Sequence, residues 1–193
     1  VSGGVRRSAM ISLSNLSDGR MRHAKSGQWW ETAPQMALAN NSVCYTDKPD
    51  GETFLREWTS LVESKSGERG IFNRISAKEQ AKKFGRRNAD YEFGTNPCSE
   101  IILRPYQFCN LTEVVIRDTD KFDDLKRKVM LATILGTAQS TLTKFPYLRK
   151  VWKDNTEEER LLGVSLTGIM DNELTSGKKH GLDKTLEALR QIA

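Results

Sequence analysis

The stretch "TNPCSEI" places three chemically different side chains at alternating positions: the amide of Asn96, the thiol of Cys98 and the carboxylate of Glu100. In an extended chain, residues i, i+2 and i+4 point to the same side at steps of roughly 7 Å, so the three groups would face one small ligand. Pro97 fixes φ and has no N–H to donate, while Gly94 permits a tight approach. The segment is therefore expected at a rigid loop tip rather than in a central strand.

The cysteine and histidine content limits the other kinds of site. The chain has three cysteines, Cys44, Cys98 and Cys109, and they contain no C-x-x-C pair. Three cysteines cannot all pair within one chain, and so few do not make a disulfide framework of the secreted kind. The two histidines, His23 and His180, are far apart in the sequence. We therefore expect thiols in a reducing compartment and no metal site.

Taken alone, the N-x-C-x-E pattern also fits an ordinary structural role. In that interpretation Cys98 is a small buried hydrophobe, Glu100 a solvated charge and Asn96 a turn residue. The pattern by itself favours this interpretation, and a functional assignment needs further motifs around it.

Composition excludes several broad classes. With 193 residues and 37% hydrophobic content, the chain can build one sizeable core or supply part of a larger one. Its 30 Lys and Arg against 25 Asp and Glu give a net charge of +5, which is too diffuse to require a nucleic-acid partner. No apolar run approaches the ~20 residues that span a bilayer, and no secretory leader pattern opens the chain. We expect a cytoplasmic protein that binds neither membrane nor nucleic acid.

The elements that must position these residues alternate between strand and helix, which predicts an α/β fold over residues 1–193. Strands are expected at residues 6–13, 41–45, 100–103 and 112–117. Helices are expected in "GETFLREWTSLVES", from an apolar stripe, in "SAKEQAKKFG", from a capping box of Ser76 and Glu79, over residues 121–143, and in "TEEERLL", from a capping box of Thr156 and Glu159.

The ends of the sequence suggest a piece of a longer protein. The chain opens without methionine at "VSGGVRRSAMISL", where a glycine turn leads directly into a strand-like segment. It closes at "TLEALRQIA", where Leu182, Leu186, Leu189 and Ile192 still mark out the face of a helix. A fragment of a larger fold is therefore expected.

Four ordered motifs give the site a context. "NPCSEI" followed by "LRPYQFCNLTEV", with "GGVRRSA" upstream and "LLGVSLTGIMD" downstream, resembles the catalytic core of adenosylcobalamin-dependent ribonucleotide reductases, in particular the monomeric ribonucleoside-triphosphate reductases. The likeness extends to "WWETAPQMALANNSV" and "GTAQSTLTKFPYLRKVW", so it covers essentially the whole chain. It implies that residues 1–193 are part of a ten-stranded α/β barrel, whose central finger loop carries the catalytic cysteine.

The resemblance also implies roles for the residues of the opening stretch. Cys98 stands at the position that becomes a thiyl radical, because an S–H bond is close enough in strength to a ribose C–H bond for reversible hydrogen transfer. Glu100 matches the general base for the 3′ hydroxyl. Asn96 matches the amide that hydrogen-bonds the ribose, and Cys109 matches one half of the dithiol that reduces the 2′ carbon.

The cofactor and partners follow from the same resemblance. They are adenosylcobalamin, a ribonucleoside triphosphate substrate, a deoxynucleoside triphosphate effector and a thioredoxin-type reductant. The segment "SGGVRRSAM" looks like the loop that links effector to substrate site, in which the glycines let the backbone move and the arginines offer donor forks for phosphate or base edges. Its residues are Gly3, Gly4, Val5, Arg6, Arg7 and Ser8. An ordinary glycine turn with solvated arginines is the alternative.

The chain also departs from the family pattern. The second cysteine of the redox dithiol has no obvious equivalent, and Cys44 in "NNSVCYTDK" is expected to be a core or strand residue instead. The terminal cysteine pair that relays electrons and most of the cobalamin-contacting region are absent from this sequence. We expect the chain to carry the radical site without completing turnover alone.

Two other functions stay open. A basic nucleic-acid-binding module could use the segment "AKKFGRRN" and its surroundings, although no aromatic residues interleave for base stacking. Its cations are Lys78, Lys82, Lys83, Arg86 and Arg87. The nearer alternative is the catalytic subunit of a di-iron-dependent reductase, which shares the loop chemistry but takes its radical from a partner protein.

Overall fold

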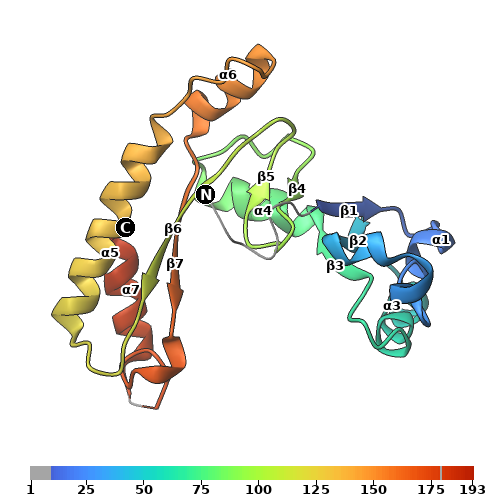
Figure 1. The fold of residues 1–193 in the computed structure, drawn as a ribbon, viewed down its shortest axis with the longest axis horizontal. Helices are drawn as coiled ribbons and strands as arrows, with labels where there is room; N and C mark the ends of the chain where they lie inside the picture. Colours follow the sequence, from blue (N-terminus) through green and yellow to red (C-terminus); the bar gives the residue numbers. More distant parts are fainter. Residues whose placement is uncertain (1–9, 179) are drawn as a thin grey trace. The chain divides into compact units, whose positions relative to one another are not determined.

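Parallel strands joined by helical crossovers form the framework of the chain (Figure 1). The computed structural model describes residues 10–178 and 180–193, which divide between Pro105 and Tyr106 into two compact units. Both units mix helix and strand, so the predicted combination of helices and strands is confirmed. The part of the predicted 6–13 strand that precedes residue 10 lies outside the described residues.

The first unit is built around a three-stranded parallel sheet in the order β1-β2-β3. Helix α3 connects β2 to β3, and a short antiparallel hairpin of β4 and β5 follows helix α4. The elements are β1 (Met10–Ser14), α1 (Gly19–Arg22), α2 (Trp29–Thr32), the 3-10 helix η1 (Pro34–Leu38), β2 (Ala39–Tyr45), α3 (Gly51–Glu63), β3 (Gly70–Asn73), α4 (Arg74–Phe84), β4 (Gly94–Thr95) and β5 (Ile102–Leu103).

Local hydrogen bonds set where the helices of this unit begin and end. The side chain of Asp50 accepts a hydrogen bond from the backbone N–H of Thr53 at 2.8 Å, which caps α3. Helix α4 begins earlier than the predicted cap, because Asn73 accepts from the N–H of Ser76 at 3.1 Å, so Ser76 lies inside the first turn. The helix ends as predicted at Gly85, whose φ of 64° is left-handed.

Helix α3 turns its polar side inward. Its one buried residue is Glu57, whereas Phe54, Leu55 and Trp58 are 40%, 61% and 51% exposed. The apolar stripe that predicted this helix therefore lies on the outer surface of the unit. Inside, the Glu57 carboxylate contacts two guanidinium groups, those of Arg22 and Arg69.

The second unit places helices against a two-stranded parallel sheet, in which Asn110 is opposite Leu162 and Val115 is opposite Thr167. Its core consists of Val114, Ile116, Leu125, Val129, Ala132 and Leu189. The elements are β6 (Asn110–Val115), α5 (Phe122–Ser140), α6 (Lys150–Glu159), β7 (Leu162–Thr167), the 3-10 helix η2 (Ile169–Asp171) and α7 (Leu182–Ile192).

The β6 strand shows the alternation expected of a sheet with one covered face. Thr112, Val114 and Ile116 are buried, while the residues between them are exposed. Helix α5 approaches β7 closely at Gly136, since a Cβ at that position would lie 2.2 Å from Cδ1 of Leu162. A larger residue there would separate helix and sheet.

The predictions for the second unit are correct in part. The strand at 112–117 and the helix at 121–143 correspond to β6 and α5, and α7 follows the apolar face of residues 182–192. The helix expected to begin at Thr156 is wrong, because Thr156 lies in the last turn of α6 and donates to the carbonyl of Trp152 at 2.7 Å. Strands β3, β4 and β7 were not predicted.

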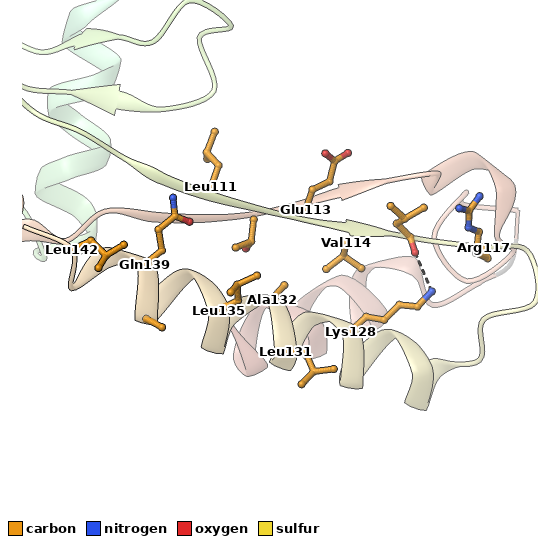
Figure 2. A pocket seen from close by; sticks show the side chains of 13 residues that line it. Leu111, Glu113, Val114, Arg117, Lys128, Leu131, Ala132, Leu135, Gln139 and Leu142 are labelled. Carbon is orange, nitrogen blue, oxygen red and sulfur yellow. Dashed lines mark hydrogen bonds between the residues drawn. The ribbon is translucent and has the colours of Figure 1, made fainter. Parts of the chain in front are cut away.

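One edge of β6 has no partner strand in the part of the chain that the structure describes. Within residues 10–178 and 180–193, β6 pairs with β7 alone, and an apolar groove runs between the other edge of β6 and helix α5 (Figure 2). Leu111, Leu131 and Leu135 line it, and Lys128 donates to the carbonyl of Val115 at 3.0 Å. None of the helices in the described residues is long and apolar enough to cross a membrane.

Candidate functional site

The predicted site lies on the tip of the β4–β5 hairpin. The last strand pair joins Thr95 to Ile102, and beyond it the N–H of Asn96 donates to the carbonyl of Ile101 at 3.3 Å. The N–H of Ser99 then donates to the carbonyl of Asn96 at 2.9 Å, which closes a four-residue turn over residues 96–99. Pro97 is the second residue of this turn, a position that suits its fixed φ. Cys98 is the third.

This geometry corrects one step of the sequence prediction and confirms another. The segment is a turn rather than an extended chain, and Ser99 has a left-handed φ of 66°, so the alternating-face argument for Asn96, Cys98 and Glu100 is wrong. The loop-tip placement is correct. The three residues still belong to one short loop, because the hairpin rather than strand alternation gathers them.

Side-chain hydrogen bonds hold the base of this loop. Asn96 Oδ1 accepts from the N–H of Ile101 at 3.1 Å and from the hydroxyl of Thr95 at 3.4 Å. The hydroxyl of Thr95 also lies 2.9 Å from the carbonyl of Ile101. Because the amide oxygen of Asn96 is used within the hairpin, its NH₂ group is the part that can donate to a ligand.

The thiol and carboxylate of the loop face solvent. Cys98 and Glu100 are both exposed, so the interpretation of Cys98 as a buried small hydrophobe is wrong. An exposed thiol on an anchored turn is accessible to a reaction partner. Glu100, two residues further along the same loop, presents its carboxylate to solvent.

Cys109 belongs to the second unit and directly precedes β6. Its thiol is half-buried. The preceding residue, Phe108, packs against Trp152 with ring centroids 4.6 Å apart and against Phe145 at 5.2 Å. The following residue, Asn110, donates its N–H to the carbonyl of Leu161 at 2.9 Å. Cys109 is thus fixed between an aromatic cluster and the first hydrogen bond of the β6–β7 sheet.

Cys44 is a core residue, as predicted. It lies in β2 and is 6% exposed. Burial raises the pKa of its thiol, and the nearby charge of Arg74 opposes this while that of Glu92 adds to it. A buried thiol with a raised pKa is a poor nucleophile.

Two cations of the basic segment considered as a nucleic-acid site, Lys78 and Arg87, have partners within their own unit. Lys78 and Arg74 pair with Glu92 at 2.5 and 3.0 Å. Arg87 donates to the carbonyl of Ile102 at 2.8 Å, and its guanidinium lies 4.9 Å from the ring centre of Phe93. These contacts give Lys78 and Arg87, two of the five cations, structural roles within the first unit.

Two further points concern the remaining sequence predictions. The glycine–arginine segment, residues 3–8, lies outside the described residues. Among the residues that the structure does describe, no three His, Cys, Asp or Glu side chains come close enough to hold a metal ion.

Sequence reasoning missed one residue at the site. The side-chain NH₂ of Asn40, on β2, donates to the carbonyl of Pro97, the peptide group that precedes Cys98. Asn40 stands 57 positions earlier in the chain, so no local pattern links the two. The available signal was a pair of asparagines, "NN", inside an otherwise strand-like segment, where asparagine is normally depleted.

Comparison with known proteins gives this geometry a family context. No protein-family model matches the chain. Curated adenosylcobalamin-dependent ribonucleoside-triphosphate reductases do match: that of Lacticaseibacillus paracasei is 32% identical over 175 residues, which are 89% of this chain and 22% of the relative. The reductase of Lactobacillus gasseri is 30% identical, over 89% of this chain and 22% of the relative. The reductase of Lactobacillus leichmannii is 29% identical, over 98% of this chain and 26% of the relative.

These similarities confirm the resemblance inferred from the motifs. They run along nearly all of the chain, but the chain spans only about a quarter of the length of these relatives.

Proposed function

We propose that this chain is part of the catalytic core of an adenosylcobalamin-dependent ribonucleoside-triphosphate reductase, a cytoplasmic enzyme that makes deoxynucleoside triphosphates for DNA synthesis. The observation that carries the proposal is the exposed Cys98 thiol on an anchored hairpin turn, within a chain similar to such reductases along about nine-tenths of its length. The relatives' names favour neither the di-iron alternative nor a nucleic-acid-binding module.

The finer fold belongs to the proposal. We infer that residues 1–193 form part of a ten-stranded α/β barrel and that the β4–β5 hairpin is its finger loop. Two features support this: the β1–β2–β3 and β6–β7 sheets are parallel with helical crossovers, and among the described residues one edge of β6 has no partner strand and lies beside an apolar groove. Such an edge suits a further strand from the longer protein.

The proposed chemistry begins at Cys98. Once its S–H hydrogen has been removed, the thiyl radical takes the 3′ hydrogen of the ribose and the S–H bond forms again. Glu100 accepts the proton of the 3′ hydroxyl, and the 2′ hydroxyl takes a proton from the dithiol that includes Cys109 and leaves as water. The NH₂ group of Asn96 donates to a ribose oxygen and orients the sugar at the turn.

Cys109 supplies half of the reducing equivalents. Together with a second cysteine from elsewhere in the longer protein, it gives two electrons and two protons, so a ribonucleotide and a dithiol become a deoxyribonucleotide, a disulfide and water. At the end Cys98 returns a hydrogen atom to C3′ of the ribose, which leaves the thiyl radical again, and then regains its S–H hydrogen as the initiating radical is re-formed. A thioredoxin-type protein would then reduce the disulfide.

The cofactor's part is limited to one event. Adenosylcobalamin supplies the organic radical that removes the S–H hydrogen, and the exposure of Cys98 fits a thiol that must meet an external radical source. The effector loop proposed at Gly3, Gly4, Val5, Arg6, Arg7 and Ser8 would carry the identity of a bound deoxynucleotide to the substrate site.

The test separates the two cysteines in the full-length parent protein. Cys98→Ser should abolish both deoxynucleotide formation and hydrogen exchange between labelled cofactor and solvent, because an O–H bond is too strong to replace S–H. Cys109→Ser should retain the exchange and lose multiple turnovers, because only the two-electron reductant is missing. Both variants are compared at matched folded concentration. Equal loss of both activities in the two variants would contradict the proposed division of roles.

A further inference from the structure

Two adjacent asparagines on β2 anchor two different loops. Asn40 donates its side-chain N–H to the carbonyl of Pro97, on the tip of the β4–β5 hairpin. Asn41 donates to the carbonyl of Met21, at the end of α1. Since successive side chains of a strand point to opposite faces, the two amides serve opposite sides of the sheet. Asn40 is the one that reaches the candidate site.

The peptide group that Asn40 holds is the one that defines the turn. In a four-residue turn, types I and II differ mainly by rotation of the central peptide, here the one between Pro97 and Cys98. A type II turn requires φ of about +80° at its third residue. In this loop Ser99 is the non-glycine residue with positive φ, and Cys98 is not. The turn is therefore not type II.

Rotation of this peptide would redirect the thiol. It would carry Cys98 into the left-handed region and swing its Cβ away from its present direction. A hydrogen bond to the carbonyl of Pro97 opposes the rotation, because the carbonyl would lose its partner. The partner comes from β2, the central strand of the sheet, which is hydrogen-bonded to a strand on each side. The turn is therefore anchored to the sheet.

We propose that Asn40 is a positioning residue for the Cys98 thiol, acting through the Pro97 carbonyl to hold the turn in one orientation. The inference rests on the proposed function for its catalytic consequence. Its structural content, that the amide of Asn40 fixes the Pro97–Cys98 peptide, stands independently. The matched variants are Asn40→Asp, which keeps the shape and removes the donor, and Asn41→Asp, which makes the same change on the opposite face.

The structural measurement uses a feature of the sequence. Pro97–Cys98 is the one proline–cysteine pair in the chain, so ¹³C-carbonyl proline with ¹⁵N-cysteine labels that single peptide bond. In Asn40→Asp we expect its carbonyl resonance to move upfield as the hydrogen bond is lost. The contact between Hα of Pro97 and the N–H of Cys98 should strengthen, because rotation of the peptide toward the type II arrangement brings these two hydrogens closer together. Asn41→Asp should change neither.

The functional measurement uses the full-length parent protein. Asn40→Asp should lower cofactor hydrogen exchange and kcat about tenfold, with the nucleotide dissociation constant unchanged, because the thiol is misdirected while the ligand site persists. Asn41→Asp should leave exchange per folded molecule unchanged. Should Asn40→Asp fail to fold, Asn40→Ser, whose hydroxyl is too short to reach, gives the same readouts.

The outcomes distinguish the two proposals. An unchanged Pro97 carbonyl resonance in both Asn40 variants overturns the positioning role, whatever the enzyme does. An upfield shift with exchange and kcat at the unmodified level also overturns it, because the thiol would then not depend on the turn. If the unmodified parent shows no reductase activity but the resonance shifts as expected, the proposed function fails and the anchoring of the turn by Asn40 remains.

Discussion

Replacing Glu57 by glutamine should destabilise the first unit severely. The Glu57 side chain is 1% exposed and contacts two cations: Oε2 accepts from Arg69 Nε at 3.0 Å, and Oε1 accepts from Arg22 Nε at 2.7 Å. Arg69 is itself 1% exposed at its side chain and donates further to Ser14 and to the backbone carbonyls that follow β1. The carboxylate therefore links α3 to the loop after β1.

The size of the effect follows from what the substitution leaves behind. Glutamine has nearly the same shape but no charge, so the positive charges of Arg69 and Arg22 stay in the interior without a counter-ion. Removing one partner of a buried ion pair costs about 3–5 kcal/mol, whereas exposed pairs contribute about 0–1 kcal/mol. Against a total of about 5–15 kcal/mol for a small domain, this is a large fraction of the stability of the first unit.

Urea denaturation followed by tryptophan fluorescence measures this loss. Trp29, Trp30 and Trp58 lie in the first unit, so a Trp152→Phe background makes fluorescence report on that unit. Glu63→Gln, at an exposed position on the same helix, is the matched control and should change the unfolding free energy by less than about 0.5 kcal/mol. A loss of less than about 1 kcal/mol for Glu57→Gln would refute the buried-charge argument.

Three further outcomes are expected. Burial by itself would raise the pKa of Glu57, but hydrogen bonds and charge from two guanidinium groups outweigh it and lower the pKa. The ion cluster therefore stabilises the fold fully above the pKa of an unfolded glutamate, about 4.3, and loses that contribution as the pH falls below it. Unfolding free energies measured between pH 7 and pH 3 should therefore fall less steeply in Glu57→Gln. Alkylation of the folded chain, followed by peptide mass spectrometry, should modify exposed Cys98 first and buried Cys44 last, and equal rates for these two would contradict the structure. Gly168→Ala should destabilise the second unit by more than Gly181→Ala: both have left-handed φ, worth about 1–2 kcal/mol, but a Cβ at Gly168 would lie 2.3 Å from a backbone carbonyl oxygen. Thermal unfolding of the two variants compares them, and equal losses would mean that the backbone relaxes around the added carbon.

Helix α3 shows what an apolar pattern can and cannot predict. The spacing of Phe54, Leu55 and Trp58 correctly indicated a helix, because that periodicity depends only on local geometry. It did not indicate that the opposite side faces the interior, because Glu57 is stabilised there by cations 35 and 12 positions away. A buried carboxylate is favourable only with its partners in place, and partners at such distances leave no local signal.

Strand predictions succeeded and failed for a related reason. β2 and β6 were predicted from β-branched and apolar residues, whereas β3 and β7 contain glycine and polar residues and are stabilised by parallel partners distant in sequence. The capping-box prediction failed at Thr156 because a threonine also fits inside a helix, where its hydroxyl can donate to the carbonyl four residues earlier. Thr156 does this with the carbonyl of Trp152.

At the candidate site, residue types were more informative than their spacing. Asn96, Cys98 and Glu100 were selected by an extended-chain argument, yet a turn brings them into one loop. Both geometries gather the same side chains because the residues are close in sequence, so the choice of residues survives an error in backbone conformation. Orientation does not: the direction of the Cys98 thiol depends on one peptide plane, and the residue that bonds it, Asn40, is identified only once β2 and the hairpin are folded together. The residue types of a loop, which are read from the local sequence, thus determine what chemistry the loop can perform. The orientation of those residues depends on contacts with the neighbouring sheet.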